Sequence, residues 1–127
     1  MSHTLLLIDD NPIQAATRQT ILRRAGYVVI AVLNPERALD QLRRQNFPGD
    51  IDLVITDHIM PSLSGAEFVT QLRVFAPHLP VLVISGLAEA QGEYRDLNVD
   101  FRVKPLLPES LLSRVQALLE LHGSATT

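Results

Sequence analysis

Five short apolar segments recur along the chain, at residues 4–8, 27–32, 51–57, 81–84 and 101–103. Runs of this length that are rich in β-branched residues indicate strands buried on both faces. Between them, apolar residues follow a helical spacing. A chain in which strand and helix alternate in this way folds into right-handed βαβ units, with a parallel sheet covered by helices on both faces. The sequence therefore predicts an α/β protein.

Capping signals mark where the helices start. Asn11-Pro12 and Asn34-Pro35 each place a capping side chain before a proline at the first helical position. Further helices are expected after Gly65, over residues 87–97, and after Pro108. In the first helix, apolar or small residues close to helical spacing predict the buried face: Ile13, Ala16, Thr17, Thr20, Ile21 and Leu22.

Length and composition limit the class of protein. The chain has 127 residues, which we expect to form one domain (1–127) with an ordered core over about 3–122 and a short tail from Gly123. The net charge is −3 with no basic stripe, so nucleic acid is not expected as a direct partner. The absence of cysteine excludes disulfides and thiol chemistry. No signal peptide or membrane-spanning stretch is recognised, and we expect a soluble cytoplasmic protein.

Polar side chains stand at the ends of four of the five predicted strands. They are Asp9-Asp10, Asp57, Ser85 and Lys104. Because ligands bind at the carboxyl edge of open α/β sheets, we expect these residues to converge there, with Asp57 at the centre. The second strand contributes no such residue, as expected for a strand at the edge of the sheet.

The chain resembles the receiver domain of response regulators in two-component signalling along nearly its whole length. The matching residues are Asp9-Asp10, Asp57, Met60-Pro61 with Gly65, Ser85, and Phe101-x-x-Lys104-Pro105. The resemblance implies a flavodoxin-like, doubly wound sheet of five parallel strands in the order 2-1-3-4-5, with five helices.

It also implies the chemistry of the site. Asp57 would be the phosphoacceptor, taking a phosphoryl group from a histidine kinase or a histidine phosphotransfer protein. Carboxylates in close contact resist joint ionisation unless a cation joins them, and Mg²⁺ suits such oxygen ligands. By resemblance, Asp10, Asp57 and the Ile59 carbonyl bind Mg²⁺ directly, and Asp9 helps through water. Lys104 would neutralise a phosphoryl oxygen.

A switch follows from the same resemblance. Ser85 and Gly86 would contact the phosphoryl group, and Phe101 would rotate toward the core. The face made by the fourth helix, fifth strand and fifth helix would then change. The resemblance further implies a cis bond between Lys104 and Pro105. The output partner is unknown, and a homodimer through this face is left open, since relatives often pair there.

Two departures from the family pattern stand out. The interval from Ser85 to Lys104 is about one helical turn shorter than in relatives, and Asn98-Val99 replaces the usual Gly-Ala. Asn tolerates the left-handed backbone that Gly supplies. We therefore expect the helix over 87–97 to be short, displaced or poorly ordered. Ile59 and Leu87 replace polar groups that help to place water in relatives, which predicts slow self-dephosphorylation.

Alternatives remain at this point. A phosphatase of the haloacid-dehalogenase type also forms an aspartyl phosphate, but it needs Asp-x-Asp after the first strand and a cap insertion. The second alternative is a degenerate receiver that serves only as a binding module. We expect Asp52 to be structural, Met60 to be core and His58 to lie on the surface. The chain is either a stand-alone receiver or a piece of a longer regulator or hybrid kinase.

Overall fold

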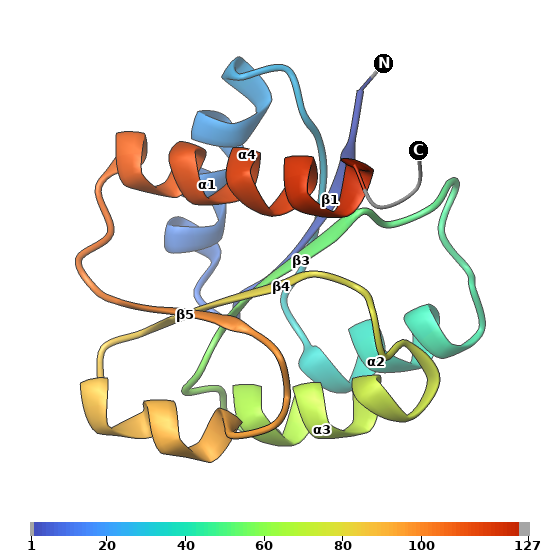
Figure 1. The fold of residues 1–127 in the computed structure, drawn as a ribbon, viewed down its shortest axis with the longest axis vertical. Coiled ribbons are helices and arrows are strands. Elements are labelled where there is room, and N and C mark those ends of the chain that lie inside the picture. Colours follow the sequence, from blue (N-terminus) through green and yellow to red (C-terminus); the bar gives the residue numbers. More distant parts are fainter. Residues whose placement is uncertain (1, 125–127) are drawn as a thin grey trace.

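A computed structural model of the protein describes residues 2–124, and its centre is one five-stranded parallel sheet (Figure 1). The strands are β1 (Thr4–Ile8), β2 (Val28–Val32), β3 (Leu53–Asp57), β4 (Val81–Ser85) and β5 (Asp100–Val103). Their order is β2-β1-β3-β4-β5, and every neighbouring pair is parallel. The predicted flavodoxin-like topology, with the second strand at the edge, is confirmed.

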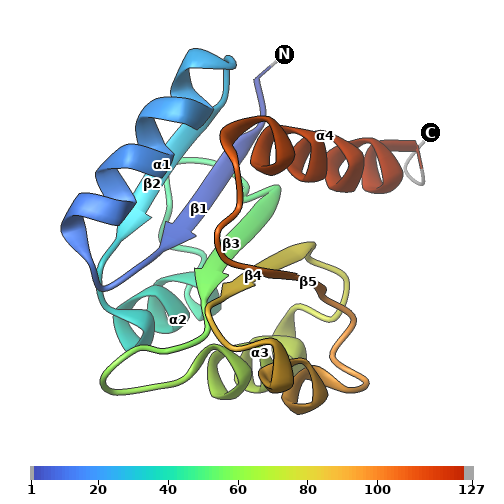
Figure 2. The ribbon, with the colours of Figure 1, turned by 90° about the vertical axis from the view of Figure 1, so that its left-hand side faces the viewer.

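Helices cover both faces of the sheet. They are α1 (Pro12–Arg24), α2 (Pro35–Arg43), α3 (Gly65–Phe75), the 3₁₀ helix η1 (Ala88–Tyr94) and α4 (Pro108–Ser124). Figure 2 shows α1 and α4 on one side of the sheet and α2 and α3 on the other. Across residues 2–124, each helix is too short or too polar to traverse a lipid bilayer.

α4 extends through Ser124, two residues into the tail that the sequence predicts from Gly123. The remainder of this tail, residues 125–127, lies outside the described residues.

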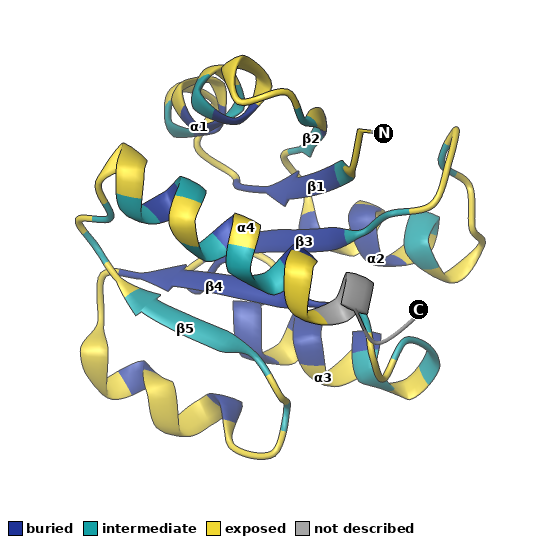
Figure 3. Cartoon of the chain, turned by 45° about the horizontal axis from the view of Figure 1, so that its top comes forward, coloured by how far each residue is buried: buried dark blue, intermediate teal, exposed yellow. Residues whose placement is uncertain are grey.

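The core consists of two layers separated by the sheet. Alternate residues of the central strands face opposite layers, so Leu6 and Val54 pack with α2 and α3 while Leu5 and Leu53 pack with α1 and α4. Figure 3 shows β1, β3 and β4 almost wholly buried and β5 only half-buried. This burial on both faces explains why the central strands read as continuous apolar runs.

Caps start the helices where the sequence predicts them. The Asn11 side chain accepts hydrogen bonds from the backbone N–H groups of Ile13 and Gln14 at 3.0 and 3.1 Å. Asn34 caps α2 in the same way. At α3, Ser64 and Glu67 form a reciprocal capping box.

The predicted buried face of α1 is only partly correct: Leu22 is buried and Ile21 packs against the core, but Ile13, Ala16, Thr17 and Thr20 are exposed. Ala15, Arg18 and Leu22 face the sheet, whereas Ile13 is 79% exposed. These three buried residues have helical spacing, but one of them is an arginine, so a search for apolar periodicity does not find the buried face. The partners that make this burial tolerable come from other elements and are described with the site.

The segment after β4 is shortened, as predicted. Only the 3₁₀ helix η1 occupies it, over residues 88–94. Asn98 then adopts a left-handed backbone with φ of 56°, which confirms the role expected for this residue. The predicted structural role of Asp52 also agrees with the structure, since its Oδ2 accepts a hydrogen bond from the Thr4 backbone N–H at 2.8 Å.

Arg73 on α3 connects that helix to the loop before β5. Its guanidinium donates to the backbone carbonyls of Leu97 at 2.8 Å and Asn98 at 3.0 Å, and to those of Ala76 and Leu79. Burial lowers the pKa of this guanidinium from its usual value. One side chain thus satisfies four carbonyls in loops that lack their own ladder.

We predict that Arg73→Met lowers the free energy of unfolding by about 2–4 kcal/mol, because charge-assisted bonds to four carbonyls are lost. Urea denaturation followed by circular dichroism measures it. Arg95→Met, which removes an equal charge from an exposed position, should change stability by less than about 0.5 kcal/mol. Equal effects of the two substitutions would contradict the assignment.

Candidate functional site

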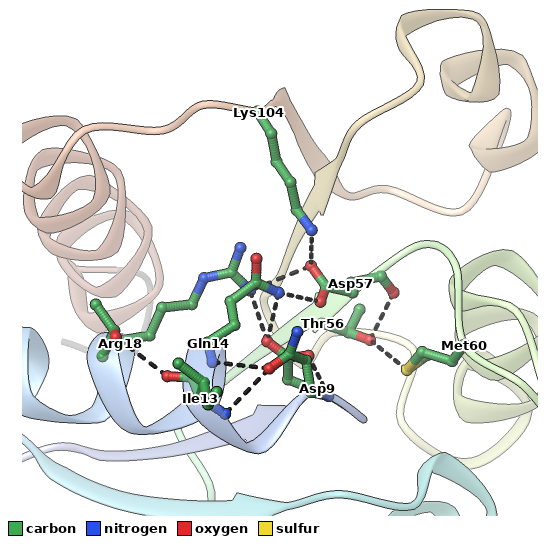
Figure 4. A network of polar contacts seen from close by, with 10 residues as sticks. Asp9, Ile13, Gln14, Arg18, Thr56, Asp57, Met60 and Lys104 are labelled. Atoms are coloured by element: carbon green, nitrogen blue, oxygen red, sulfur yellow. Dashed lines mark hydrogen bonds and ion pairs between the residues drawn. The ribbon is translucent and has the colours of Figure 1, made fainter.

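Carboxylates from two neighbouring strands meet at the carboxyl edge of the sheet (Figure 4). Asp57 is the last residue of β3, and Asp9 and Asp10 directly follow β1. Oxygen atoms of these three side chains lie within 4.8 Å of one another. Lys104, which follows β5, places its Nζ 3.2 Å from Asp57 Oδ1. The sequence predicted this convergence, because parallel strands bring their carboxyl ends to one edge.

Two of the three carboxylates are deeply buried. Asp9 is 0% exposed and Asp57 4%, whereas Asp10 is exposed. Burial raises the pKa of Asp9, a shift that its hydrogen bonds from Gln14 and the Asn11 N–H oppose and the adjacent Asp57 increases. Closely spaced carboxylate oxygens are the donor set that Mg²⁺ prefers, so the residues present fit this ion.

Two residues of α1 that the sequence analysis missed complete the cluster. Gln14 Nε2 donates to Asp9 Oδ2 and to Asp57 Oδ2, both at 2.7 Å. The guanidinium of Arg18 donates to Asp9 Oδ2 at 3.3 Å and to Asp57 Oδ1 at 3.1 Å. The two residues are four apart on a helix that begins just after Asp9-Asp10, a spacing that puts both on one face. That spacing is the sequence feature from which the two residues could have been predicted as part of the site.

The predicted switch residues lie nearby, in contacts of their own. Ser85 is buried, and its hydroxyl donates to the Leu87 carbonyl at 3.1 Å and accepts from the Leu87 N–H at 2.9 Å. Gly86 beside it is exposed. Phe101 is half-buried, with its ring centroid 5.5 Å from that of Tyr94. Pro105 follows a cis peptide bond, in the form that the resemblance implies.

His58 was expected on the surface, and this is wrong. The ring is 6% exposed, and its Nδ1 lies 2.7 Å from the hydroxyl of Tyr94. Its Nε2 lies 3.4 Å from a carboxylate oxygen of Glu93. Burial raises the pKa of the Tyr94 phenol well above its usual range, with smaller contributions from Glu93 and Asp57. Both partners come from η1, 35 and 36 positions along the chain, so the sequence around His58 held no sign of them.

Of the apolar residues near Asp57, Met60 agrees with its predicted role, whereas the roles predicted for Ile59 and Leu87 stay predictions. Met60 is 7% exposed and belongs to the core, as predicted. Ile59 is 65% exposed at the site's rim, and Leu87 is 40% exposed.

The fold and the site together define a class of regulatory domain, and comparison with known proteins identifies it. The model of the response regulator receiver domain family matches residues 5–116. The chain belongs to this family. Receiver domains bind Mg²⁺ at an acidic aspartate cluster, and the family implies a histidine kinase or phosphotransfer protein as partner.

Named relatives agree with this assignment. The chain is 32% identical over 129 residues to the transcriptional regulatory protein PrrA of Mycobacterium tuberculosis, covering 99% of this chain and 54% of the relative. It is 36% identical over 122 residues to the C4-dicarboxylate transport transcriptional regulatory protein DctD of Pseudomonas aeruginosa, covering 93% of this chain and 25% of the relative. The chain thus spans about half or less of the length of these curated relatives.

Solved structures agree as well. The chemotaxis response regulator CheY4 of Vibrio cholerae superposes with a TM-score of 0.82 at 27% identity, covering 94% of this chain and 100% of that one. A CheY-like receiver domain protein from Methanospirillum hungatei has a TM-score of 0.88 at 20% identity, covering 98% and 99% of the two chains. The second likeness shows the fold alone.

Gly65 shapes the loop that follows Asp57. Its N–H donates to the His58 carbonyl at 2.7 Å. A Cβ at this position would collide with the Tyr94 hydroxyl, lie 2.6 Å from the Asp57 carbonyl oxygen and 3.0 Å from His58 Cα. The close approach of two backbone segments therefore requires glycine here.

We predict that Gly65→Ala lowers the free energy of unfolding by at least about 2 kcal/mol, although alanine normally favours a helix start, because the added methyl meets backbone atoms. Gly49→Ala is the matched control, since a Cβ there meets nothing within 4 Å, and stability should stay equal or rise by up to about 1 kcal/mol. Urea denaturation measures both. A neutral Gly65→Ala would refute the steric argument.

Proposed function

We propose that Asp57 is the phosphoacceptor of this receiver domain, which we take to span residues 1–127, and that phosphorylation at Asp57 is its signal. One observation carries the proposal: a buried carboxylate at the end of β3 that lies beside Asp9 and Asp10 and is paired with Lys104 at 3.2 Å. Such a set combines a nucleophile, a metal site and a fixed positive charge. These are the requirements of phosphoryl transfer to a carboxylate.

In the proposed reaction an Asp57 oxygen attacks the phosphorus of a phosphohistidine. The new oxygen–phosphorus bond forms as the phosphorus–nitrogen bond breaks, and the donor imidazole keeps the electron pair and takes up a proton. The Lys104 ammonium neutralises a phosphoryl oxygen during the transfer. Its direct contact with Asp57 suits this role. Mg²⁺ held by Asp9, Asp10 and Asp57, with the Ile59 carbonyl, would supply further positive charge to those oxygens.

The signal would leave the site through Ser85, Gly86 and Phe101. A phosphoryl group on Asp57 offers the Ser85 hydroxyl a stronger acceptor than the Leu87 carbonyl it contacts now. If Ser85 moves inward, the face formed by η1, β5 and α4 rearranges around Phe101. The 3₁₀ helix η1 is connected to this face, since Tyr94 packs against Phe101 and lies 2.7 Å from His58, so a movement at Ser85 and Leu87 would reach β5 through η1.

The two alternatives find no support. In this chain β1 is followed directly by α1, and Asp-Asp-Asn stands where a haloacid dehalogenase needs Asp-x-Asp. A degenerate receiver would lack part of the reactive set, whereas Asp9, Asp10, Asp57 and Lys104 are all present and adjacent.

The acceptor is tested with Mg²⁺ and either beryllium fluoride or a small phosphodonor. We expect one phosphoryl group on Asp57 by peptide mass spectrometry, and changed amide signals in η1 and β5 by NMR on adding beryllium fluoride. Asp57→Asn should abolish both, since an amide is not a nucleophile for this transfer. The exposed Asp50→Asn is the matched control and should react as the wild type does. Equal modification of Asp57→Asn would refute the proposal.

The exposed apolar pair at the rim predicts a long-lived signal. Ile59 and Leu87 provide no group to orient water toward a phosphoryl on Asp57. We expect the double substitution Ile59→Asn with Leu87→Glu to speed loss of the phosphoryl group by about tenfold or more, a smaller gain than the roughly hundredfold of a side chain that itself transfers the proton. Decay after removal of the phosphodonor measures it. An unchanged decay rate would contradict this explanation of the lifetime.

A further inference from the structure

The acceptor carboxylate already has a protein donor on each of its oxygens, and two of these donors come from α1. Arg18 and Lys104 contact Asp57 Oδ1, and Gln14 contacts Oδ2. We propose that Arg18 is an internal cation that competes with Mg²⁺ for the carboxylates of Asp9 and Asp57, so that the protein binds Mg²⁺ tightly only when Asp57 is phosphorylated. The inference extends the proposed function and takes the same site as its subject.

The competition follows from shared atoms. Arg18 donates from a single nitrogen to both Asp9 and Asp57, which places the guanidinium between two of the carboxylates that would hold the metal (Figure 4). Asp9 Oδ1 also accepts from the Asn11 N–H at 2.9 Å. Every carboxylate oxygen of Asp9 and Asp57 is therefore hydrogen-bonded to protein. Asp57 Oδ1 already accepts from two cations, Arg18 and Lys104, so direct coordination by this oxygen requires that one of them give way.

Charge makes Arg18 the donor that matters most. Its side chain is 10% exposed, so water screens it weakly. Arg18 and Lys104 together leave the three carboxylates with one unbalanced negative charge. A divalent cation added to this set would make it positive, which opposes binding. Without Arg18 the same ion would bring the set to neutrality.

Phosphorylation changes the balance. A carboxylate that becomes an acyl phosphate gains roughly one further negative charge and three acceptor oxygens. Mg²⁺, Lys104 and Arg18 then together neutralise the site, and the displaced guanidinium finds an anionic partner close by. The cost of moving Arg18 is thereby recovered only in the phosphorylated form. Metal binding and phosphorylation become coupled through one side chain.

A purely structural role is the competing explanation. Arg18 faces the sheet from α1 and would hold the helix against β1 and β3 by its two ion pairs. In that case its removal would lower stability but leave intrinsic Mg²⁺ affinity unchanged. The two explanations therefore predict different Mg²⁺ affinities for the Arg18→Met protein.

The experiment is calorimetric titration of the full chain with Mg²⁺, with and without beryllium fluoride. For Arg18→Met, which keeps much of the volume, we expect Mg²⁺ to bind at least about tenfold more tightly than to wild type, given the effect of one adjacent charge on an ionic site. With beryllium fluoride present the difference should shrink. Arg24→Met removes an equal charge from the exposed end of α1 and should match wild type. Equal Mg²⁺ affinity of Arg18→Met and wild type would overturn the inference.

A measurement on wild type keeps the test decisive if Arg18→Met fails to fold. The Arg18 Nε–H signal should shift during Mg²⁺ titration with the same midpoint as the Asp57 amide, because the guanidinium must leave the carboxylates. An Arg18 signal that stays constant at saturating Mg²⁺ would also overturn the inference. Failure of the proposed function is distinguishable, since it appears as absent modification of Asp57 whatever the Mg²⁺ affinity.

Discussion

The burial of two carboxylates side by side is the constraint on which the rest of this structure depends. Asp9 and Asp57 lose almost all contact with water, a loss that costs several kcal/mol per ion unless charge and hydrogen bonds compensate. The compensation comes from Arg18, Gln14 and Lys104. Among the described residues, no buried side-chain nitrogen or oxygen lacks a hydrogen-bond partner. The site is an unfavourable charge arrangement made tolerable by groups from two distant parts of the chain, α1 and the residue that follows β5.

The fold holds these charged residues in position. β1 and β3 are adjacent and in register, with Ile8 opposite Thr56, so the residues that follow them emerge at one edge. Gly65 brings the loop after β3 back against the acceptor, and the buried His58 ties the same loop to Tyr94 of η1. Asp57 is thus held by α1, and the loop that follows it is held by η1, the element proposed to respond. A change of charge at Asp57 acts on both.

Much of the fold and part of the site could be predicted from sequence. The strand order followed from the resemblance, and the alternation of strands and helices followed from apolar runs and caps that are local and strong. Asp9, Asp57 and Lys104 were predictable because each stands at the end of a strand whose direction is known. For Arg18 the only sign was its spacing from Gln14 on one helix face, and for His58 there was none, since a polar residue in a helix or after a strand normally faces water. Only contacts with residues distant in sequence make their burial favourable.

The sequence by itself determined the alternation of strands and helices, the helix starts at Asn11 and Asn34 and the polar residues that end the strands. These features depend on short-range periodicity, capping and strand ends. The tertiary structure decided which face of α1 is buried, and with it the cation that shares the acceptor's oxygens. The physical reason is that a buried charge is stable only beside its partner, and Arg18 and Asp57, which are 39 positions apart in the sequence, meet only in the folded protein.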